Sequence, residues 1–381
     1  MALVKTLTGQ FAKIKVLGVG GGGNNAINSM ILEDDIKGVD FVAVNTDSQA
    51  LLNSQASIKI QLGEKLTKGL GAGGNPQIGQ QAAEESRDKI REILEGTDMV
   101  FITGGMGGGT CTGAAPIIAE IAKNELGILT IAVVTKPFLF EGTRRMTNAE
   151  EGISLLRDHV DTLVVIPNQK VVEIVSDKTT LLEAFKIADS VLHKGTKAIA
   201  DLITTPGLIN LDFADIKTVM SNAGSALMGV GEAEGENRAK IAVESAIVSP
   251  LVEANIEGAR GILINITGGT DLTMSEIEEA AKTITQHSSP DANIIFGATI
   301  NKNLEGKIKI TVIATGFSPS RPHLYQTTIN VPAKPPRSVT LPNIPEIDQE
   351  KVKKLLGNNE LPAGIDIVDE FDIPAFLRKN K

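Results

Sequence analysis

"GGMGGGTCTGAAP", residues 104–116, contains six glycines in ten residues, two threonines and the only cysteine of the chain. It overlaps the end of an apolar run, "MVFITGG" (99–105), that is typical of a buried strand. Glycine lets backbone N–H groups approach an anion closely, and a helix that begins at such a loop adds partial positive charge. The stretch therefore predicts an anion-binding turn between a strand and a helix.

Short apolar runs alternate with helical patterns from about residue 13 onward. The runs expected to form buried strands are "IKVLGVG" (14–20), "FVAVNT" (41–46), "MVFITGG" (99–105), "LTIAVVT" (129–135) and "TLVVIP" (162–167). A helix is expected over residues 75–94, with Asn75 as its N-cap and Pro76 in its first position. This alternation predicts a doubly wound α/β domain with a parallel sheet.

A long helical pattern, residues 177–203, follows this domain, with Thr180 and Glu183 as a candidate capping box. A helix of about 25 residues spans about 38 Å, enough to connect two domains. The elements expected beyond it are helices around 213–230 and 236–251, a strand at 261–267, a helix at 273–287, and strands at 293–300 and 307–315. We expect the last two strands to pair antiparallel in a smaller α+β domain.

Nine of the sixteen prolines follow Phe317, and residues 318–364 show no sustained periodicity, as in a disordered linker with a reach on the order of 40 Å. The expected segments are a flexible N-terminus (1–12), an α/β domain (13–176), a connecting helix (177–203), a loop and α+β domain (204–317), the linker (318–364) and a tail (365–381).

The composition excludes several classes of protein. One cysteine leaves no internal disulfide framework and indicates a reducing compartment. The first residues lack an apolar run long enough for a signal peptide, and no run in the chain reaches the roughly 18 residues of a membrane span. A net charge of −9 argues against a general nucleic-acid binder. We expect a soluble, cytoplasmic chain that neither inserts into a membrane nor binds nucleic acid.

Three glycine-rich loops belong to the first domain: "GVGGGGNNAI" (18–27), "KGLGAGGNP" (68–76) and the opening stretch. The first fits a dinucleotide fingerprint, with Asp40 near the spacing of a ribose contact, so a nicotinamide-dependent oxidoreductase is one alternative. Tight turns explain any single loop, but three loops together favour a polyphosphate ligand. The Walker pattern is absent, so backbone dipoles, a metal ion and Arg145 would have to meet the phosphate charge.

The opening stretch resembles the tubulin-type signature G-G-G-T-G-[ST]-G. Together with "AVNTDSQAL", "GLGAGGNP", "KPFLFEGTRR" and "NLDFADIKTVM", it closely resembles the FtsZ family of tubulin-like GTPases over residues 12–317, and "DIPAFLRK" (372–379) is similar to the family's tail. The resemblance implies a tubulin-like fold, binding of GTP and GDP with Mg²⁺, and head-to-tail filaments that scaffold the bacterial division ring. It also implies a cytoplasmic location at the division site and a role in septation.

The resemblance also implies roles for individual residues. The phosphates would be cradled by Gly20, Gly21, Gly22, Gly107, Gly108, Gly109 and Thr110. The γ-phosphate would be sensed by Gly71, Ala72 and Gly73, and the ribose and neighbouring phosphate contacted by Glu141 and Arg145. Guanine would be read by Asn25, Asn168 and Asp189, with Phe185 stacked on the base. A carboxylate suits guanine because it accepts from the ring N–H and the amino group together. Taken without the family, Asp189 is simply a solvated helix position, and the sequence assigns no metal ligand.

None of the glycine loops contains an Asp, Glu or His placed to orient an attacking water. Candidates occur in "NLDFAD" (210–215), which supplies Asn210, Asp212 and Asp215. Read locally, Asp212 is a helix N-cap with Asp215 at N3. The resemblance implies instead that this loop enters the nucleotide site of the next subunit, so that hydrolysis is coupled to assembly. A tubulin-like scaffold with weak hydrolysis is the remaining alternative.

Two further expectations concern the tail and the cysteine. From composition the end of the chain fits a partner-binding motif and a frayed end equally well, and the resemblance implies that Phe371, Ile373, Phe376 and Leu377 dock into membrane-anchoring and regulatory division proteins. Cys111 stands where the family signature has glycine. We expect it to be a tolerated first-turn helix residue with a helical φ, rather than a redox-sensing thiol.

Overall fold

The computed structural model describes residues 12–33, 36, 38–170, 179–204, 207–209, 212–247 and 258–317. The predicted linker and tail and Asn210 lie outside these residues, as does the predicted N-terminal segment apart from Ala12.

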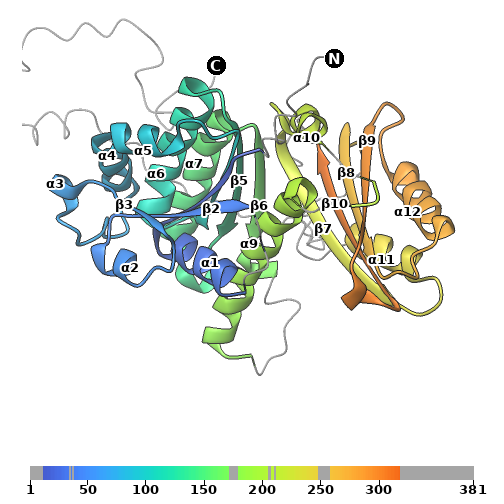
Figure 1. Cartoon of the computed structure of the whole chain (residues 1–381). Helices are drawn as coiled ribbons and strands as arrows, with labels where there is room; N and C mark the ends of the chain where they lie inside the picture. The colour runs from blue at the N-terminus through green and yellow to red at the C-terminus, as the bar shows by residue number, and fades with distance from the viewer. Residues whose placement is uncertain are drawn as a thin grey trace, which may run out of the picture. The chain divides into compact units, whose positions relative to one another are not determined.

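Six parallel strands form the sheet of the first half, in the order β3-β2-β1-β4-β5-β6 (Figure 1). Their bounds are β1 Ile14–Val19, β2 Val39–Asn45, β3 Ile58–Gln61, β4 Met99–Gly105, β5 Leu129–Lys136 and β6 Thr162–Pro167. This order confirms the doubly wound parallel sheet. The strand order reverses between β1 and β4, so a ligand crevice is expected at their carboxyl ends.

Two apolar cores cover the two faces of this sheet. Val16 of β1 belongs to the core beneath α1 and α9, whereas its neighbour Leu17 belongs to the core beneath α4 to α7 (Figure 1). The helices and short turns are α1 Gly20–Glu33, α2 Ser48–Leu52, α3 Glu64–Thr67, α4 Pro76–Glu85, α5 Arg87–Leu94, α6 Thr110–Glu120, η1 Ile121–Glu125, η2 Leu139–Glu141 and α7 Thr143–His159. Burial on both faces explains why most of these strands are nearly continuous apolar runs.

The predicted helix 75–94 begins as expected and then divides. Asn75 Oδ1 accepts the N–H of Gln77 at 3.0 Å, and Pro76 occupies the first helical position. The division comes at Ser86, whose buried hydroxyl accepts the N–H of Gly63 at 3.0 Å. This hydrogen bond to a neighbouring loop holds the Ser86 side chain in place, and a new helix, α5, begins at Arg87.

The predicted connecting helix is α9, Leu181–Thr204. Its capping box is present: Glu183 Oε2 accepts the N–H of Thr180 at 2.8 Å, and Thr180 Oγ1 accepts the N–H of Glu183 at 3.3 Å. Leu192 and Ile199 are buried in the core shared with α1. The central helix is therefore packed into this core from Val191 to Leu202 and is not a free-standing connector.

The second half adds four strands to the same sheet, giving β6-β7-β10-β8-β9. The bounds are α10 Phe213–Met220, β7 Gly224–Glu234, α11 Arg238–Ile247, β8 Gly261–Gly268, α12 Met274–His287, β9 Asn293–Ile300, η3 Lys302–Leu304 and β10 Lys307–Thr315. The smaller α+β half is as predicted, but β9 and β10 do not pair with each other. β8 lies between them, parallel to β9 and antiparallel to β10. Burial accounts for the difference, since β10 is almost wholly buried and takes a central place, whereas β9 is half exposed and lies at the edge.

The predicted helix 213–230 is also wrong beyond Met220, because residues 224–234 form β7. A Cβ atom at Gly229 or Gly231 would lie 1.7 or 1.9 Å from the carbonyl oxygen of Ala246 or Ala242. These glycines let the backbone of α11 rest directly on the strand. The two glycines of β7 are therefore explained by the close approach of a helix and not by a turn. They also interrupt the apolar pattern by which the strand could have been predicted.

Candidate functional site

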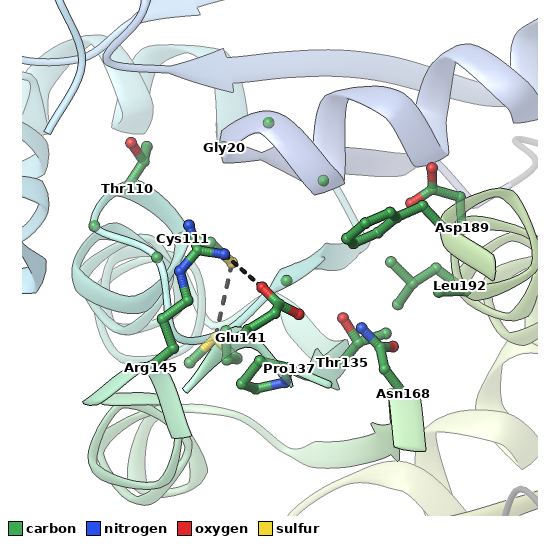
Figure 2. A pocket seen from close by; sticks show the side chains of 18 residues that line it. Gly20, Thr110, Cys111, Thr135, Pro137, Glu141, Arg145, Asn168, Asp189 and Leu192 are labelled. Atoms are coloured by element: carbon green, nitrogen blue, oxygen red, sulfur yellow. Dashed lines mark hydrogen bonds and ion pairs between the residues drawn. The ribbon is translucent and has the colours of Figure 1, made fainter. Parts of the chain in front are cut away.

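A cavity of about 260 Å³ lies at the carboxyl ends of β1, β4, β5 and β6 (Figure 2). Eleven of the predicted site residues line it: Gly20, Gly21, Gly22, Gly108, Gly109, Thr110, Glu141, Arg145, Asn168, Phe185 and Asp189. They come from five separate segments of sequence. The fold therefore brings together at one crevice the residues that the glycine loops and the family resemblance singled out.

Two helices begin at one end of the cavity. α1 starts at Gly20, whose φ of +72° favours glycine, and α6 starts at Thr110. Asn24 is buried between carbonyl oxygens. With its side-chain nitrogen turned toward them, it donates to the carbonyl oxygens of Val44 and Gly18 at 3.2 and 3.1 Å and holds the β1–α1 turn. Both helix N-termini direct free backbone N–H groups and partial positive charge toward the cavity, as an anion site requires.

Gly107 and residues 71–73 support this end without lining it. Gly107 has a φ of +100°, and its N–H donates to Thr112 Oγ1 at 2.8 Å. A Cβ atom at Gly109 would lie 2.8 Å from Ala72 Cβ and 2.9 Å from the backbone nitrogen of Asn75. The 68–76 loop is thus packed in backbone contact behind the signature loop.

The other end of the cavity carries acceptor oxygens. Asn168 is buried, and its Oδ1 has no hydrogen-bond partner among the described residues. Burial raises the pKa of Asp189 from 3.8 to about 6. Phe185 lies edge-on to Phe138, with ring centroids 5.4 Å apart. Unpaired acceptors beside an aromatic ring suit a flat ligand that offers N–H donors, such as guanine.

Glu141 and Arg145 lie between the two ends and form an ion pair (Figure 2). Glu141 Oε1 also accepts the N–H of Phe138 at 2.9 Å, which fixes the carboxylate. The Arg145 side chain is 56% exposed against 13% for Glu141, so the arginine is the more mobile member and can turn toward an anionic ligand.

Three predicted residues lie elsewhere in the described chain. Asn25 is exposed on α1 and does not line the cavity. Asp212 and Asp215 form a capping box at the start of α10: Asp212 Oδ1 accepts the N–H of Asp215 at 2.8 Å, and Asp215 Oδ2 accepts the N–H of Asp212 at 3.3 Å. The local prediction of an N-cap is confirmed, and neither aspartate enters the chain's own cavity.

Seven lining residues were not predicted: Gly105, Met106, Cys111, Thr135, Pro137, Ala188 and Leu192. Thr135 and Pro137 lie at the carboxyl end of β5, where the strand-end rule would have placed them. Ala188 and Leu192 follow Phe185 at helical spacing, so the face that carries Asp189 was also readable.

Cys111 has a helical φ, since Lys68, Asn222 and Asn237 are the only non-glycine residues with positive φ in the described ranges. This confirms the predicted position in the first turn of a helix. Its Sγ lies 3.7 Å from Met106 Sδ, and burial raises the pKa of the thiol to about 12. A buried thiol that stays protonated is a poor nucleophile, which argues against a redox-sensing role.

No group of three or more His, Cys, Asp or Glu residues that could hold a metal ion occurs in the described part of the chain. Within the same residues, no helix combines the length and the apolar character that crossing a bilayer demands.

Comparison with known proteins gives consistent matches. The profile of the Tubulin/FtsZ family, GTPase domain, matches residues 13–176, and that of the FtsZ family, C-terminal domain, matches residues 224–318. The chain is 50% identical over 379 residues to the cell division protein FtsZ of Coxiella burnetii, covering 97% of both chains.

Solved structures agree with these sequence matches. An empty FtsZ dimer from M. jannaschii is similar at a TM-score of 0.76 and 51% identity, over 81% of this chain and 89% of that one. CetZ2 from Haloferax volcanii, a GTPγS-bound protofilament, has a TM-score of 0.69 at 20% identity, over 81% and 94% of the two chains, and shows the tubulin-like fold alone. Matches over both halves, at half the residues identical, show that the chain belongs to the FtsZ family of tubulin-like GTPases.

Proposed function

We propose that this chain hydrolyses GTP at a site shared between two copies, assembles head to tail into filaments, and so scaffolds the ring of bacterial cell division. One observation carries the shared site. Among the described residues that line the cavity, the only carboxylates are Glu141, which is paired with Arg145, and Asp189, which lies at the opposite end from the helix N-termini. Neither is placed to orient a water at a terminal phosphate, and we infer that the acidic group comes from another molecule.

GTP fits the two ends of the cavity. The phosphates would lie against the N-termini of α1 and α6, with residues 71–73 close to the γ-phosphate. The base would lie between Asn168 and Asp189, with Phe185 against its face. Adenine presents no paired N–H donors to an aspartate, so this end discriminates between the purines. Asn25 and the Glu141–Arg145 pair would contact the nucleoside from the rim.

Mg²⁺ would neutralise charge that develops on the phosphates. Because the described residues offer no cluster of acidic ligands, the ion would be held mainly by phosphate oxygens and water, the arrangement that Mg²⁺ commonly adopts in nucleotide sites. The chain's own part is to fix the phosphates against two helix N-termini and to exclude bulk water.

The acidic groups of the second copy would be Asp212 and Asp215, with Asn210 beside them. Exposed apolar side chains support a protein contact on both sides of such a junction. Leu70 and Leu139, from the loops around the cavity, are 86% and 66% exposed, and Leu208, just before the aspartates, is 73% exposed. A contact between two different faces of the same chain, with a rotation that does not close, produces filaments.

The test is phosphate release from GTP followed against protein concentration. We expect the rate per subunit to rise with concentration as copies meet. Asp212→Ala should bind GTP and assemble but turn over at least tenfold more slowly. Because alanine also removes the helix cap, at a cost of about 1 kcal/mol, Asp212→Asn is the matched variant: asparagine still caps α10 but lacks the charge. Normal turnover by Asp212→Asn at every concentration would remove the shared site.

The alternatives are separable by binding and rate. An oxidoreductase would bind NAD in place of GTP in equilibrium dialysis. The described histidines, His159, His193 and His287, do not line the cavity, which leaves hydride transfer without a proton partner there. A weakly hydrolysing scaffold would bind GTP and assemble but release phosphate at the same slow rate with and without Asp212.

The tail is part of the same proposal. Phe371, Ile373, Phe376 and Leu377 fall outside the described residues, and we propose that they dock onto membrane-anchoring and regulatory division proteins. The chain would then work in the cytoplasm at the division site, held to the membrane by its partners.

A further inference from the structure

Thr46 contacts both loops of the cavity's phosphate end although it does not itself line the cavity. It directly follows β2, and its side chain is fully buried. Its hydroxyl oxygen lies 2.7 Å from that of Thr110, the first residue of α6. Its carbonyl oxygen accepts the N–H of Gly71 at 3.2 Å. One residue thus joins the signature loop to the 68–76 loop.

The direction of the hydroxyl–hydroxyl bond decides what Thr110 can do. In the ligand-free chain either oxygen can be the donor. A phosphate oxygen only accepts, so Thr110 must donate its single proton to bind one. Thr46 must then be the donor to Thr110, and a chain of two hydrogen bonds that point the same way strengthens both.

The cavity's layout indicates which phosphate this is. Thr110 lies at one end, and Asn168 and Asp189, the proposed guanine contacts, lie at the other (Figure 2). A nucleotide laid along the cavity therefore presents its terminal phosphate to Thr110. The neighbouring Gly71 belongs to the loop proposed to sense the same group.

We propose that Thr46 is a positioning residue for GTP. Its hydroxyl donates to Thr110, so that the Thr110 hydroxyl donates to the terminal phosphate. Its carbonyl oxygen accepts the N–H of Gly71 and so couples the orientation of Thr110 to the 68–76 loop. This inference rests on the proposed assignment of the cavity to GTP. A purely structural role predicts something different: Thr46 would then satisfy a buried hydroxyl, and its loss would lower stability without changing which nucleotide binds.

The experiment compares the dissociation constants of GTP and GDP for the full-length chain and three variants. Thr46→Val keeps the shape and removes the hydroxyl. Thr46→Ser keeps the hydroxyl. Thr130→Val is the matched control, because Thr130 is equally buried, makes one side-chain bond of 2.9 Å, and lies at the opposite end of β5 from the cavity. Unfolding in urea measures the structural cost of each change.

We expect Thr46→Val to weaken GTP about tenfold and GDP less than threefold, since a hydrogen bond to a charged oxygen carries roughly that factor. Thr46→Ser should stay within about threefold of the wild type for both nucleotides. Thr130→Val should lose stability comparably but keep the wild-type ratio of affinities. In a Thr110→Val background, Thr46→Val should not weaken GTP binding further, because the hydrogen bond from Thr110 to the phosphate is already lost.

If Thr46→Val weakens the binding of GTP and GDP equally, or weakens neither, the proposal that Thr46 orients Thr110 is overturned. If valine prevents folding, Thr46→Cys, a weaker donor, takes its place and must lower the preference for GTP. A wild-type chain that binds neither nucleotide would instead overturn the proposed function, so the two failures are distinguishable.

Discussion

Asp189, a half-buried residue at the proposed guanine end, would set a pH limit on the binding of GTP. Burial raises its pKa from 3.8 to about 6, so the folded chain holds this proton more tightly than the unfolded chain does. The ligand-free protein therefore gains stability from this group at low pH and loses it as pH rises from about 4 through 6. The loss is on the order of 1–2 kcal/mol, less than the full shift because the carboxylate is partly exposed.

Guanine needs the ionised form, so binding follows the opposite trend. We expect the dissociation constant of GTP to rise about tenfold per pH unit below pH 6 and to be level above pH 7. Asp189→Asn should bind GTP weakly at all pH values, without this slope. Titrations between pH 5 and 8 measure both. A wild-type affinity independent of pH would show that Asp189 does not meet the base.

Cys111 is the residue at which the chain departs from its family's signature. Its side chain is buried against Met106 in a helical backbone, so we expect Cys111→Gly to lower the free energy of unfolding by about 1–2 kcal/mol, through lost burial and greater backbone entropy. GTP affinity should stay within about threefold. Denaturant unfolding and equilibrium binding measure the two effects. A marked gain in affinity or turnover would mean that the cysteine is a cost to the site.

At the scale of elements, the sequence predicts what burial on both faces makes visible. The strands around the cavity are nearly continuous apolar runs because two cores cover them. The glycine loops at their carboxyl ends followed from that pattern, whereas Glu141, Asn168, Phe185 and Asp189 came only from the family resemblance. β7 was not predicted because Gly229 and Gly231 interrupt the alternation of apolar and polar residues that marks a strand. Glycine is required at both positions because the backbone of α11 lies against them. That contact is tertiary, and no local pattern encodes it.

The same glycines carry a stability prediction. A Cβ atom at Gly231 would lie 1.9 Å from the carbonyl oxygen of Ala242, so Gly231→Ala must push α11 off the sheet. We expect a loss of about 2–4 kcal/mol, as for other overpacked or displaced cores. Ala233→Ser, two residues along the same face and only half-buried, should cost under 1 kcal/mol. Urea midpoints of both variants measure the difference, and equal costs would refute the contact.

At the scale of the whole molecule, the sequence alone could name the aspartates but not say where they act. Asp212 and Asp215 satisfy each other's backbone N–H groups at the start of α10, so the structure of one chain already accounts for them locally. The cavity, in turn, lacks an acidic group at its phosphate end among the described lining residues. The proposed shared site accounts for both facts, because a second copy of the chain would bring its α10 to the first copy's cavity.

Mixing two inactive variants tests this directly. Asp212→Asn has an unaltered cavity but lacks the carboxylate that we propose it supplies to a neighbour. Asp189→Ala has an unaltered α10 but lacks the proposed guanine contact in its cavity. Each alone should release phosphate slowly. In an equal mixture, up to about a quarter of head-to-tail junctions would join a sound cavity to a sound Asp212, and phosphate release should recover toward that fraction of the wild-type rate. The control is a mixture of Asp189→Ala with Asp212→Asn,Asp189→Ala, which contains no sound cavity and should not recover. Since a site contained within one chain cannot be repaired by mixing, an inactive first mixture that still forms mixed filaments would place hydrolysis within the single subunit.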